Sequence, residues 1–187
     1  ESEKLCSHLH IPLQSGDDTI LKAMRRNYNR SQYLEVVQRA VTAIPGLGLG
    51  ADVIVGFPNE TEEAFENTRN LIEQFPFSYL HVFSYSPRRG TEAHQIKDSV
   101  PGNIKKQRNQ ILTQLVHQKA LKYREQFIDQ SETVLIENQR DTKSGWLKGH
   151  TSNYIPVILE GSDSLKNSLV PVTLQNISEK QVTGCVQ

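Results

Sequence analysis

The sequence predicts an α/β protein with two parts: a layered α/β region followed by a small all-β barrel. Between residues 8 and 85, three strand-like runs alternate with helical stripes of apolar residues, the pattern of parallel βαβ units. After Asp129, five short strand-like runs follow within about 60 residues, as in small closed barrels. The length of 187 residues suits one domain or two small ones. We place the boundary near residue 126, giving regions 1–125 and 126–187.

The first strand and the first two helices are marked by local patterns. Residues 8–13 alternate between polar and apolar side chains, which predicts a half-buried strand. Residues 15–18 combine turn and capping residues before a short helix. A second helix is predicted from about Ser31, where apolar residues form a helical stripe, to the Pro45–Gly46 stop.

Two more strands and a third helix complete the predicted βαβ pattern. A strand over about 49–55 ends at Gly56-Phe57-Pro58. Asn59 and Glu62 have the spacing of a capping box for the helix that follows. The third strand covers residues 79–85.

A long helix with a basic exposed face is predicted over about Ile104–Ile128. This face suits contact with water or, alternatively, contact with RNA. The five barrel strands that follow are predicted at residues 133–137, 146–150, 154–159, 169–174 and 181–186.

Charge and cysteine content narrow the class of protein. Lys plus Arg equals Asp plus Glu at 21 each, so any contact with nucleic acid must come from local patches. Cys6 and Cys185 lie near opposite ends of the chain, which predicts neither a disulfide framework nor a CxxC metal site. No apolar run has the length of a membrane span. We expect a cytoplasmic protein with reduced thiols and no membrane partner.

The start of the chain also carries information. It begins at Glu1 without an initiator Met, and a strand-like run follows almost at once. We therefore expect the chain to be a piece of a longer protein.

A ligand site is predicted at the carboxyl ends of the three strands, where parallel α/β proteins bind ligands. One strand face would line the interior, and Gly56 on it would let the backbone approach a ligand closely. Ile54 and Phe83 on that face would enclose a flat ring or, alternatively, pack the interior. His8 and His10 lack a third local metal ligand, so no metal site is predicted. The residues assigned to this face are His10, Gln14, Asp52, Ile54, Gly56, His81, Phe83 and Tyr85.

Several segments together resemble one enzyme family. They are His8–Gly16, Met24–Arg26, Asp52–Thr61, His81–Ser86, Gly90–Thr91 and Gly149–Ile155. They are similar to the second half of the radical S-adenosylmethionine (SAM) core of methylthiotransferases. The later segments favour the branch that acts on N6-threonylcarbamoyladenosine at position 37 of tRNA. Members that act on isopentenyladenosine or on a ribosomal protein share the core.

The resemblance implies both fold and activity. Residues 1 to about 125 would supply three parallel strands of a partial (β/α)6 TIM-like barrel, with residues 8–13 at an open sheet edge. Residues from about 126 would form a TRAM domain, a small barrel that holds RNA. The parent enzyme would add a methylthio group to C2 of the modified adenine, using SAM and two 4Fe-4S clusters. None of the cluster-binding cysteines lies in this chain, so the chain alone is expected to be inactive. The sulfur source and the electron donor stay open.

The resemblance also implies SAM contacts. Gln14 and Ser15 would hydrogen-bond polar groups of SAM, while Ile54, Gly56 and Phe83 would form the wall for its adenosine. The family pattern Gly-x-Ile-x-Gly-x-x-Glu keeps Ile54 and Gly56 but places an acid, Asp52, at its first glycine. Its own acid is displaced to Glu60.

Two groups of residues are candidates for RNA contact. Arg25, Arg26, Arg88 and Arg89 would bind phosphates or, alternatively, form surface salt bridges. Lys148, His150 and Tyr154 cluster around one predicted barrel hairpin, which would combine cations with aromatic stacking. The competing interpretation is an RNA-binding barrel on a non-catalytic α/β region.

Overall fold

The chain forms two compact units in a computed structural model that describes residues 5–96, 99–178 and 180–187. One unit comprises His10–Ile44 and Leu49–Lys119 and holds most of the parallel sheet. The other comprises Ala120–Gln187 with two short segments, the residues up to Leu9 and Pro45–Gly48. The predicted boundary at residue 126 stays a prediction about domain organisation. Across the described residues, no helix combines the length and the apolar character needed to cross a membrane.

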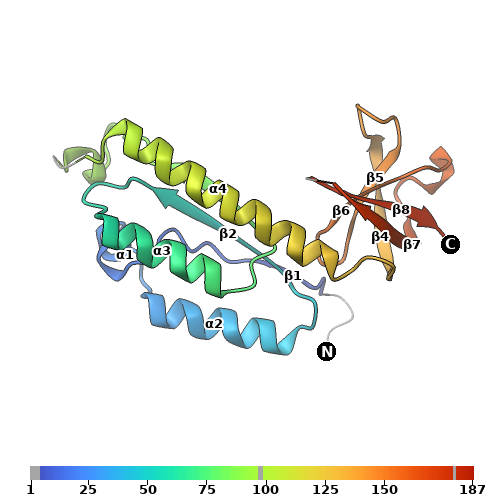
Figure 1. The fold of residues 1–187 in the computed structure, drawn as a ribbon, viewed down its shortest axis with the longest axis horizontal. Coiled ribbons are helices and arrows are strands. Elements are labelled where there is room, and N and C mark those ends of the chain that lie inside the picture. The colour runs from blue at the N-terminus through green and yellow to red at the C-terminus, as the bar shows by residue number, and fades with distance from the viewer. Residues whose placement is uncertain (1–4, 97–98, 179) are drawn as a thin grey trace. The chain divides into compact units, whose positions relative to one another are not determined.

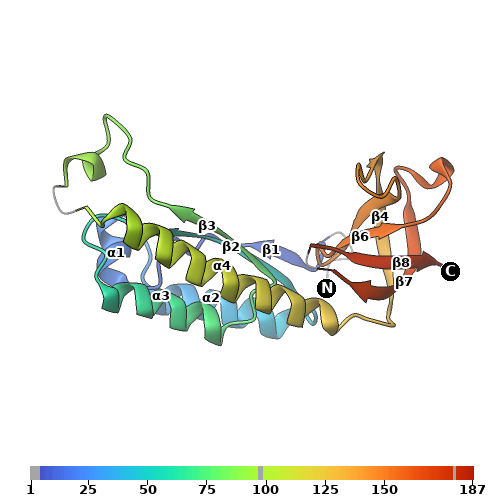
Figure 2. The same ribbon diagram turned by 45° about the horizontal axis from the view of Figure 1, so that its top comes forward.

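The sheet has three strands in the order β1-β2-β3, of which Figure 1 labels β1 and β2 and Figure 2 labels all three. They are β1 (His8–His10), β2 (Gly48–Val55) and β3 (Tyr79–Ser84). β2 and β3 pair in parallel, with Ile54 opposite Phe83. β1 lies at one edge of the sheet, as predicted.

The first strand is shorter than the predicted run of residues 8–13. Pro12 has no N–H to donate to a ladder. Gln14 has a positive φ of 65°, so the backbone turns there. The N–H groups of Leu13 and Gln14 both donate to the Asp52 carbonyl, at 3.2 and 2.8 Å. The chain therefore stays beside β2 without a regular ladder.

Three capped helices belong to the sheet-containing unit: α1 (Asp18–Ala23), α2 (Arg30–Ala43) and α3 (Glu62–Gln74). Asn29 and Gln32 form a capping box at the start of α2. The capping box predicted from Asn59 and Glu62 is wrong. Thr61 caps α3 instead, by accepting a hydrogen bond from the Ala64 N–H, and Asn59 has a positive φ of 65°. The left-handed turn at Asn59 moves the start of the helix two residues along the chain.

The two faces of the sheet differ in exposure. Leu49, Ala51, Val53 and Val55 alternate along β2 with no solvent exposure, and α1–α3 lie to the same side of the sheet (Figure 2). The long helix α4 (Gly102–Glu125) also contacts the sheet, because Asn109 donates a hydrogen bond to the Val82 carbonyl at 3.1 Å. α4 ends three residues before the predicted end at Ile128. The opposite face carries the exposed side chains of His10, His81 and Phe83.

The barrel is closed, with strand order β4-β5-β6-β8-β7, as the five predicted strands require. Its strand pairs are antiparallel except β6–β8, which is parallel. Val134, Ile136, Leu147, Val172 and Leu174 are among its fully buried residues. The strands are β4 (Ser131–Arg140), β5 (Leu147–Thr151), β6 (Pro156–Leu159), β7 (Leu169–Ile177) and β8 (Val182–Val186). Short 3-10 turns cover Glu92–Gln95 before α4 and Asp163–Leu165 between β6 and β7.

We predict that Gly149→Ala destabilises the barrel by about 1–3 kcal/mol. Gly149 pairs with Ile136, and a Cβ at residue 149 would lie 2.2 Å from the backbone oxygen of Leu135. Denaturation followed by fluorescence of Trp146, the single tryptophan, measures the change in the barrel unit. Gly102→Ala is the control, because nothing lies within 4 Å of its Cβ position. Equal stability of Gly149→Ala and the unsubstituted chain would contradict the barrel register.

Candidate functional site

A pocket of about 470 Å³ lies at the carboxyl ends of the strands. This volume falls in the range of small-molecule sites. We call it the strand-end pocket. Its lining combines apolar rings with a carboxylate, an amide and a guanidinium, and includes Gln14, Asp52, Ile54, Phe83, Tyr85 and Arg88.

Three of the predicted cofactor-binding residues meet in this pocket: Gln14, Ile54 and Phe83. Ile54 and Phe83 are opposite each other on neighbouring strands. Phe83 is 52% exposed, so its ring is a wall of the pocket rather than part of a packed interior. The two side chains form an apolar surface suited to one face of a flat ring.

The positive φ of Gln14 belongs to the same pocket. Its backbone is bonded on both sides, because its N–H donates to the Asp52 carbonyl and its own carbonyl accepts from the Ile54 N–H at 2.9 Å. A non-glycine residue in the left-handed region is uncommon and needs support from its surroundings. These bonds to β2 provide that support.

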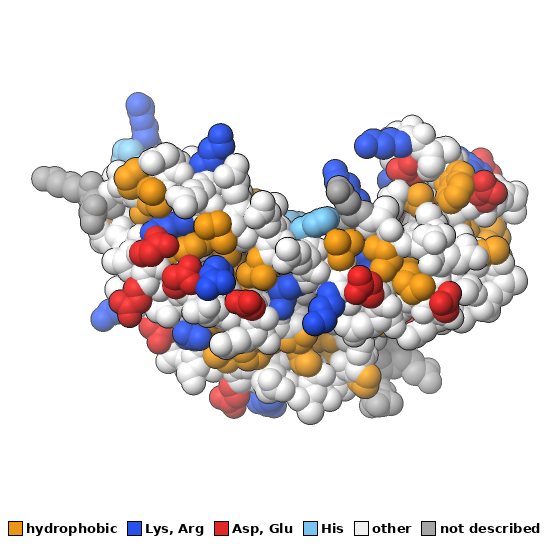
Figure 3. All heavy atoms as spheres, in the orientation of Figure 1, with side chains coloured by type: hydrophobic (Ala, Val, Ile, Leu, Met, Phe, Trp, Pro, Cys, Tyr) orange, Lys and Arg blue, Asp and Glu red, His pale blue; other side chains and the backbone are white. Residues whose placement is uncertain are grey.

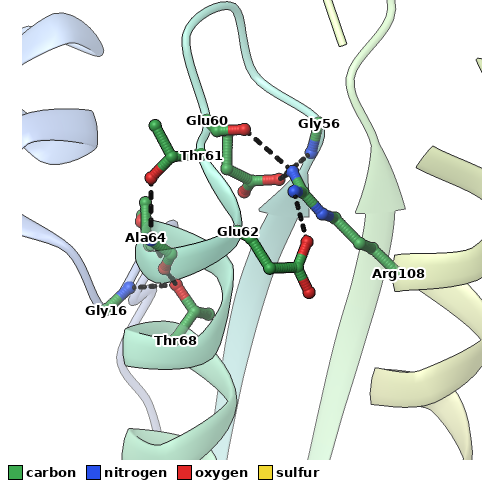
Figure 4. Close-up of polar contacts among 9 residues, drawn as sticks. Gly16, Gly56, Glu60, Thr61, Glu62, Ala64, Thr68 and Arg108 are labelled. Atoms are coloured by element: carbon green, nitrogen blue, oxygen red, sulfur yellow. Dashed lines mark hydrogen bonds and ion pairs between the residues drawn. The ribbon is translucent and has the colours of Figure 1, made fainter. Parts of the chain in front are cut away.

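Ser15 is not among the residues that line the strand-end pocket. Ser15 is 1% exposed, and its Oγ lies 3.4 Å from Thr68 Oγ1. The neighbouring Gly16 N–H donates to the same Thr68 hydroxyl at 2.9 Å (Figure 4). A Cβ at Gly16 would lie 2.7 Å from Thr68 Cα, so glycine permits this close approach. These contacts fasten the loop after β1 to α3.

Gly56 also lies outside the lining of the strand-end pocket and ends β2 with a positive φ of 72°. The position of a Cβ at this residue is occupied by the Lys105 side chain, 2.2 Å away at Cγ. Its N–H donates to Glu60 Oε2 at 2.7 Å. Glu60, the displaced acid, therefore closes the turn that follows β2.

Glu60 is half of a buried ion pair with Arg108 of α4 (Figure 4). Their side chains are 1% and 6% exposed, and Arg108 Nη1 lies 2.7 Å from Glu60 Oε2. Arg108 also donates to the Glu60 carbonyl at 2.9 Å and pairs with Glu62 at 2.9 Å. Burial raises the pKa of Glu60, and the Gly56 N–H and Arg108 act in the opposite direction. The network joins the end of β2, the start of α3 and α4.

A second pocket, of about 740 Å³, adjoins the first and shares Ile54, Tyr85, Thr91 and Ala93 with it. Arg25 and Arg26 line it, and Arg25 forms an ion pair with Glu92. Arg88 lines the strand-end pocket, whereas Arg89 is exposed in the same loop and lines neither pocket. The four arginines were predicted to bind phosphates or, alternatively, to form surface salt bridges. Arg25 forms such a salt bridge.

The barrel hairpin brings Lys148 and His150 together on the outer face of β5, because Leu147, Gly149 and Thr151 between and beside them are buried. Both contact Glu137 of β4: Lys148 Nζ at 3.3 Å and His150 Nδ1 at 2.9 Å. Glu137 could not be predicted from the sequence as a partner of these residues, because its position beside them depends on the β4–β5 register.

Tyr154 is half exposed at the same hairpin. Its ring stacks on His150 with centroids 4.6 Å apart and on His8 with centroids 4.4 Å apart. All three rings belong to the barrel-containing unit. The predicted cluster of Lys148, His150 and Tyr154 is therefore one connected surface. The face of the protein in Figure 3 carries charges of both signs, consistent with the equal numbers of basic and acidic residues in the chain.

The chain does not offer a site for an iron–sulfur cluster in its described part. Such clusters are held mostly by three or four thiolates, whereas Cys6 and Cys185 are the two cysteines and both are exposed. The described residues contain no group of three His, Cys, Asp or Glu side chains arranged to hold a metal ion. By contrast, the strand-end pocket has the apolar wall and polar groups that suit an adenosine-containing ligand such as SAM.

Comparison with known sequences shows which proteins the chain resembles. Residues 2–72 match the Radical SAM superfamily. Relatives that match nearly the whole chain carry the names of enzymes that methylthiolate tRNA.

Three relatives show how far the similarity extends. The chain is 40% identical to "tRNA-2-methylthio-N(6)-dimethylallyladenosine synthase" of Akkermansia muciniphila, over 92% of the chain. It is 42% identical to the protein of that name from Geobacillus kaustophilus, over 96% of the chain. It is 39% identical, over 92%, to "Threonylcarbamoyladenosine tRNA methylthiotransferase MtaB" of Bacillus subtilis. The aligned part covers 38%, 34% and 39% of these relatives, respectively.

We predict that Arg108→Ala destabilises the sheet-containing unit by about 3–5 kcal/mol, because it leaves a buried carboxylate without its partner. The loss also depends on pH. Arg108 lowers the pKa of Glu60, so its removal raises that pKa further above the ordinary value of 4.5. A carboxyl with a raised pKa binds its proton more tightly in the folded state than in the unfolded state. This proton binding stabilises the folded state fully below pH 4.5, and the stabilisation is lost as the pH rises through the raised pKa. The destabilisation should therefore grow from pH 4.5 to 7.

Chemical denaturation followed by far-UV circular dichroism, which reports the helices, measures this change. Arg69→Ala is the matched control, because Arg69 pairs with Glu66 and Glu73 on the surface of α3 and such pairs contribute at most about 1 kcal/mol. If Arg108→Ala were no more destabilising than Arg69→Ala at pH 7, the Glu60–Arg108 pair would contribute no more to the stability of the unit than a surface ion pair does.

Proposed function

We propose that this chain is part of a tRNA methylthiotransferase that adds a methylthio group to C2 of N6-threonylcarbamoyladenosine at position 37, in the anticodon loop. The similarity to tRNA methylthiotransferases over nearly the whole chain carries the proposal. We expect the reaction to take place in the cytoplasm, where its tRNA substrate is found. The sheet would contribute three strands to a partial TIM-like barrel, and the closed barrel would be a TRAM domain.

The strand-end pocket supports binding of SAM. In the proposed reaction one molecule of SAM would supply the methyl group, and a second, cleaved with an electron from a donor, would supply the radical that removes hydrogen from C2. Ile54 and Phe83 would hold the adenine ring on the apolar wall. Gln14, fixed by its bonds to β2, would offer its amide to polar groups of the ligand. Ser15 and Gly56 would act through the loops that they hold rather than by lining the pocket.

The barrel hairpin supports contact with tRNA. Lys148 provides a cationic group, and His150 and Tyr154 provide stacked rings, of which Tyr154 is half exposed. Phosphate contacts and base stacking are the two means by which such barrels bind single-stranded RNA. In the sheet-containing unit, Arg26 and Arg88 would contact phosphates beside the pockets, and Arg89 would do so from its exposed loop. Arg25 would join them once its bond to Glu92 opens.

Two other functions compete with this proposal. Relatives named for dimethylallyladenosine favour methylthiolation of isopentenyladenosine instead, and a ribosomal protein is a third substrate class in the family. A non-catalytic RNA-binding module is the other class of function. The non-catalytic interpretation applies only to the chain taken alone. Cys6 and Cys185 are both exposed, and the described residues contain no cluster site.

The substrate is tested by expressing the protein that carries this chain in a bacterial strain without tRNA methylthiotransferases. Mass spectrometry of the tRNA nucleosides should then detect the 2-methylthio derivative of N6-threonylcarbamoyladenosine. Detection of the isopentenyladenosine derivative alone would contradict the proposed specificity but support the reaction. Detection of neither derivative would contradict the proposed function.

The RNA surface is tested by two substitutions with opposite expected effects. Lys148→Ala should weaken binding of the chain to a tRNA anticodon stem-loop and reduce the salt dependence by about one phosphate contact. Glu137→Gln should strengthen binding, because it removes the negative charge beside Lys148 and His150. Lys166→Ala is the control, a lysine of the same unit that is paired with Asp163. Equal effects of Lys148→Ala and Lys166→Ala would place the RNA contact elsewhere.

A further inference from the structure

Asp52 is a carboxylate in the wall of the strand-end pocket that the proposed function has not used. It replaces the first glycine of the family pattern and lies on the open face of β2. Its Oδ2 lies 3.1 Å from His10 Nε2 of the edge strand, and its side chain is 29% exposed. The carboxylate therefore contacts His10 through one oxygen, and the residue also lines the pocket.

His10 is held at both ring nitrogens. Nε2 faces the Asp52 carboxylate, and Nδ1 lies 3.1 Å from the hydroxyl of Tyr79. A carboxylate only accepts hydrogen bonds, so Nε2 must carry the proton of that contact. In the neutral ring, Nδ1 then accepts from the Tyr79 O–H. A hydrogen-bonded line, Tyr79–His10–Asp52, therefore crosses the three strands and fixes the orientation of the carboxylate.

The position of Tyr79 depends on a glycine in the neighbouring strand. Gly50 pairs with Tyr79 in the β2–β3 register. A Cβ at residue 50 would lie 2.1 Å from Cζ and 2.3 Å from the hydroxyl oxygen of Tyr79. The Tyr79 ring therefore lies over a strand position that has no side chain. Gly50 lies within β2, so a strand position without a side chain contributes to the site.

We propose that Asp52 binds the vicinal hydroxyls of the ribose of an adenosine-type ligand, and that His10 and Tyr79 are its positioning residues. The inference rests on the proposed adenosyl pocket. Ile54 and Phe83 form the wall for the flat ring, and Asp52 lies two residues along the same face of β2, about 6.6 Å from Ile54. The sugar next to the ring is thereby brought to the carboxylate. Among the described residues, Asp52 Oδ1 makes no hydrogen bond that would compete with a hydroxyl donor.

The proposal is tested by binding of adenosine and of 2′,3′-dideoxyadenosine to the full 187-residue chain, followed by NMR titration. These probes differ in the hydroxyls that Asp52 would bind. We expect the unsubstituted chain to prefer adenosine by about tenfold or more, as hydrogen bonds to a charged group allow. Asp52→Asn should reduce adenosine affinity to that of the dideoxynucleoside and leave the dideoxynucleoside affinity unchanged. Glu35→Gln, on the exposed surface of α2, is the matched control.

Positioning by His10 has a separate readout. His10→Leu should reduce the preference for adenosine several-fold, and His10→Gln should restore much of it, because the glutamine amide retains an N–H donor for Asp52. Tyr79→Phe should reduce the preference less than His10→Leu, since it removes only the outer bond of the line. A purely structural role for these residues would instead lower the affinity for both nucleosides together, and that result would overturn the positioning role.

Phe83→Ala separates failure of this inference from failure of the pocket. If Phe83→Ala weakens binding of both nucleosides while Asp52→Asn leaves the preference for adenosine intact, the ribose role of Asp52 is overturned and the adenosyl pocket stands. If the unsubstituted chain binds neither nucleoside, or if Phe83→Ala changes neither affinity, the pocket proposal fails and this inference fails with it.

Discussion

The buried ion pair between Glu60 and Arg108 is the constraint on which the strand-end pocket depends. Removing two charges from water is costly, and the cost is offset only by good geometry and further hydrogen bonds. Here the carboxylate accepts from Arg108 and from the Gly56 N–H, and Arg108 reaches the Glu60 carbonyl and Glu62 as well. The turn after β2 is therefore fixed at both its first and last residues. Because Ile54 lies two residues before that turn, the apolar wall of the pocket is fixed with it.

One face of the parallel sheet packs the core, and the other face carries the polar and aromatic side chains of the site. One face of β2 consists of fully buried aliphatic residues, and burial of such surface is the main stabilising contribution in folding. The other face holds His10, Asp52, Tyr79, His81 and Phe83, which contact one another through hydrogen bonds and ring edges. Since strand residues alternate between faces, one short strand supplies both a core and a polar site. Gly50 makes this possible by leaving space for the Tyr79 ring.

The ion pairs of the barrel hairpin are partly exposed, unlike the buried pair of Glu60 and Arg108. Lys148 and His150 share a single partially exposed carboxylate, Glu137. Pairs of this kind contribute little to stability because water screens them. Their effect is instead on the local potential, which Glu137 makes less positive than Lys148 alone would make it. The affinity of this surface for an anionic partner is thus set by a residue of the neighbouring strand.

The resemblance to a known family implied the edge position of the first strand. The sequence by itself determined the element order, the five barrel strands and the residues that share the open sheet face. These features follow from local periodicity and from turn residues, both of which are visible along a single chain. The sequence also marked Gln14, Ile54 and Phe83 as neighbours, because strand ends meet at one edge of a parallel sheet. The tertiary structure decided the rest. It showed that Thr61 rather than Asn59 caps α3, that Glu60 closes the Gly56 turn, and that Glu137 and Asp52 are partners of residues on other strands. Each of these contacts depends on the register between strands or on a backbone angle, and neither is encoded in the spacing of residues along the chain.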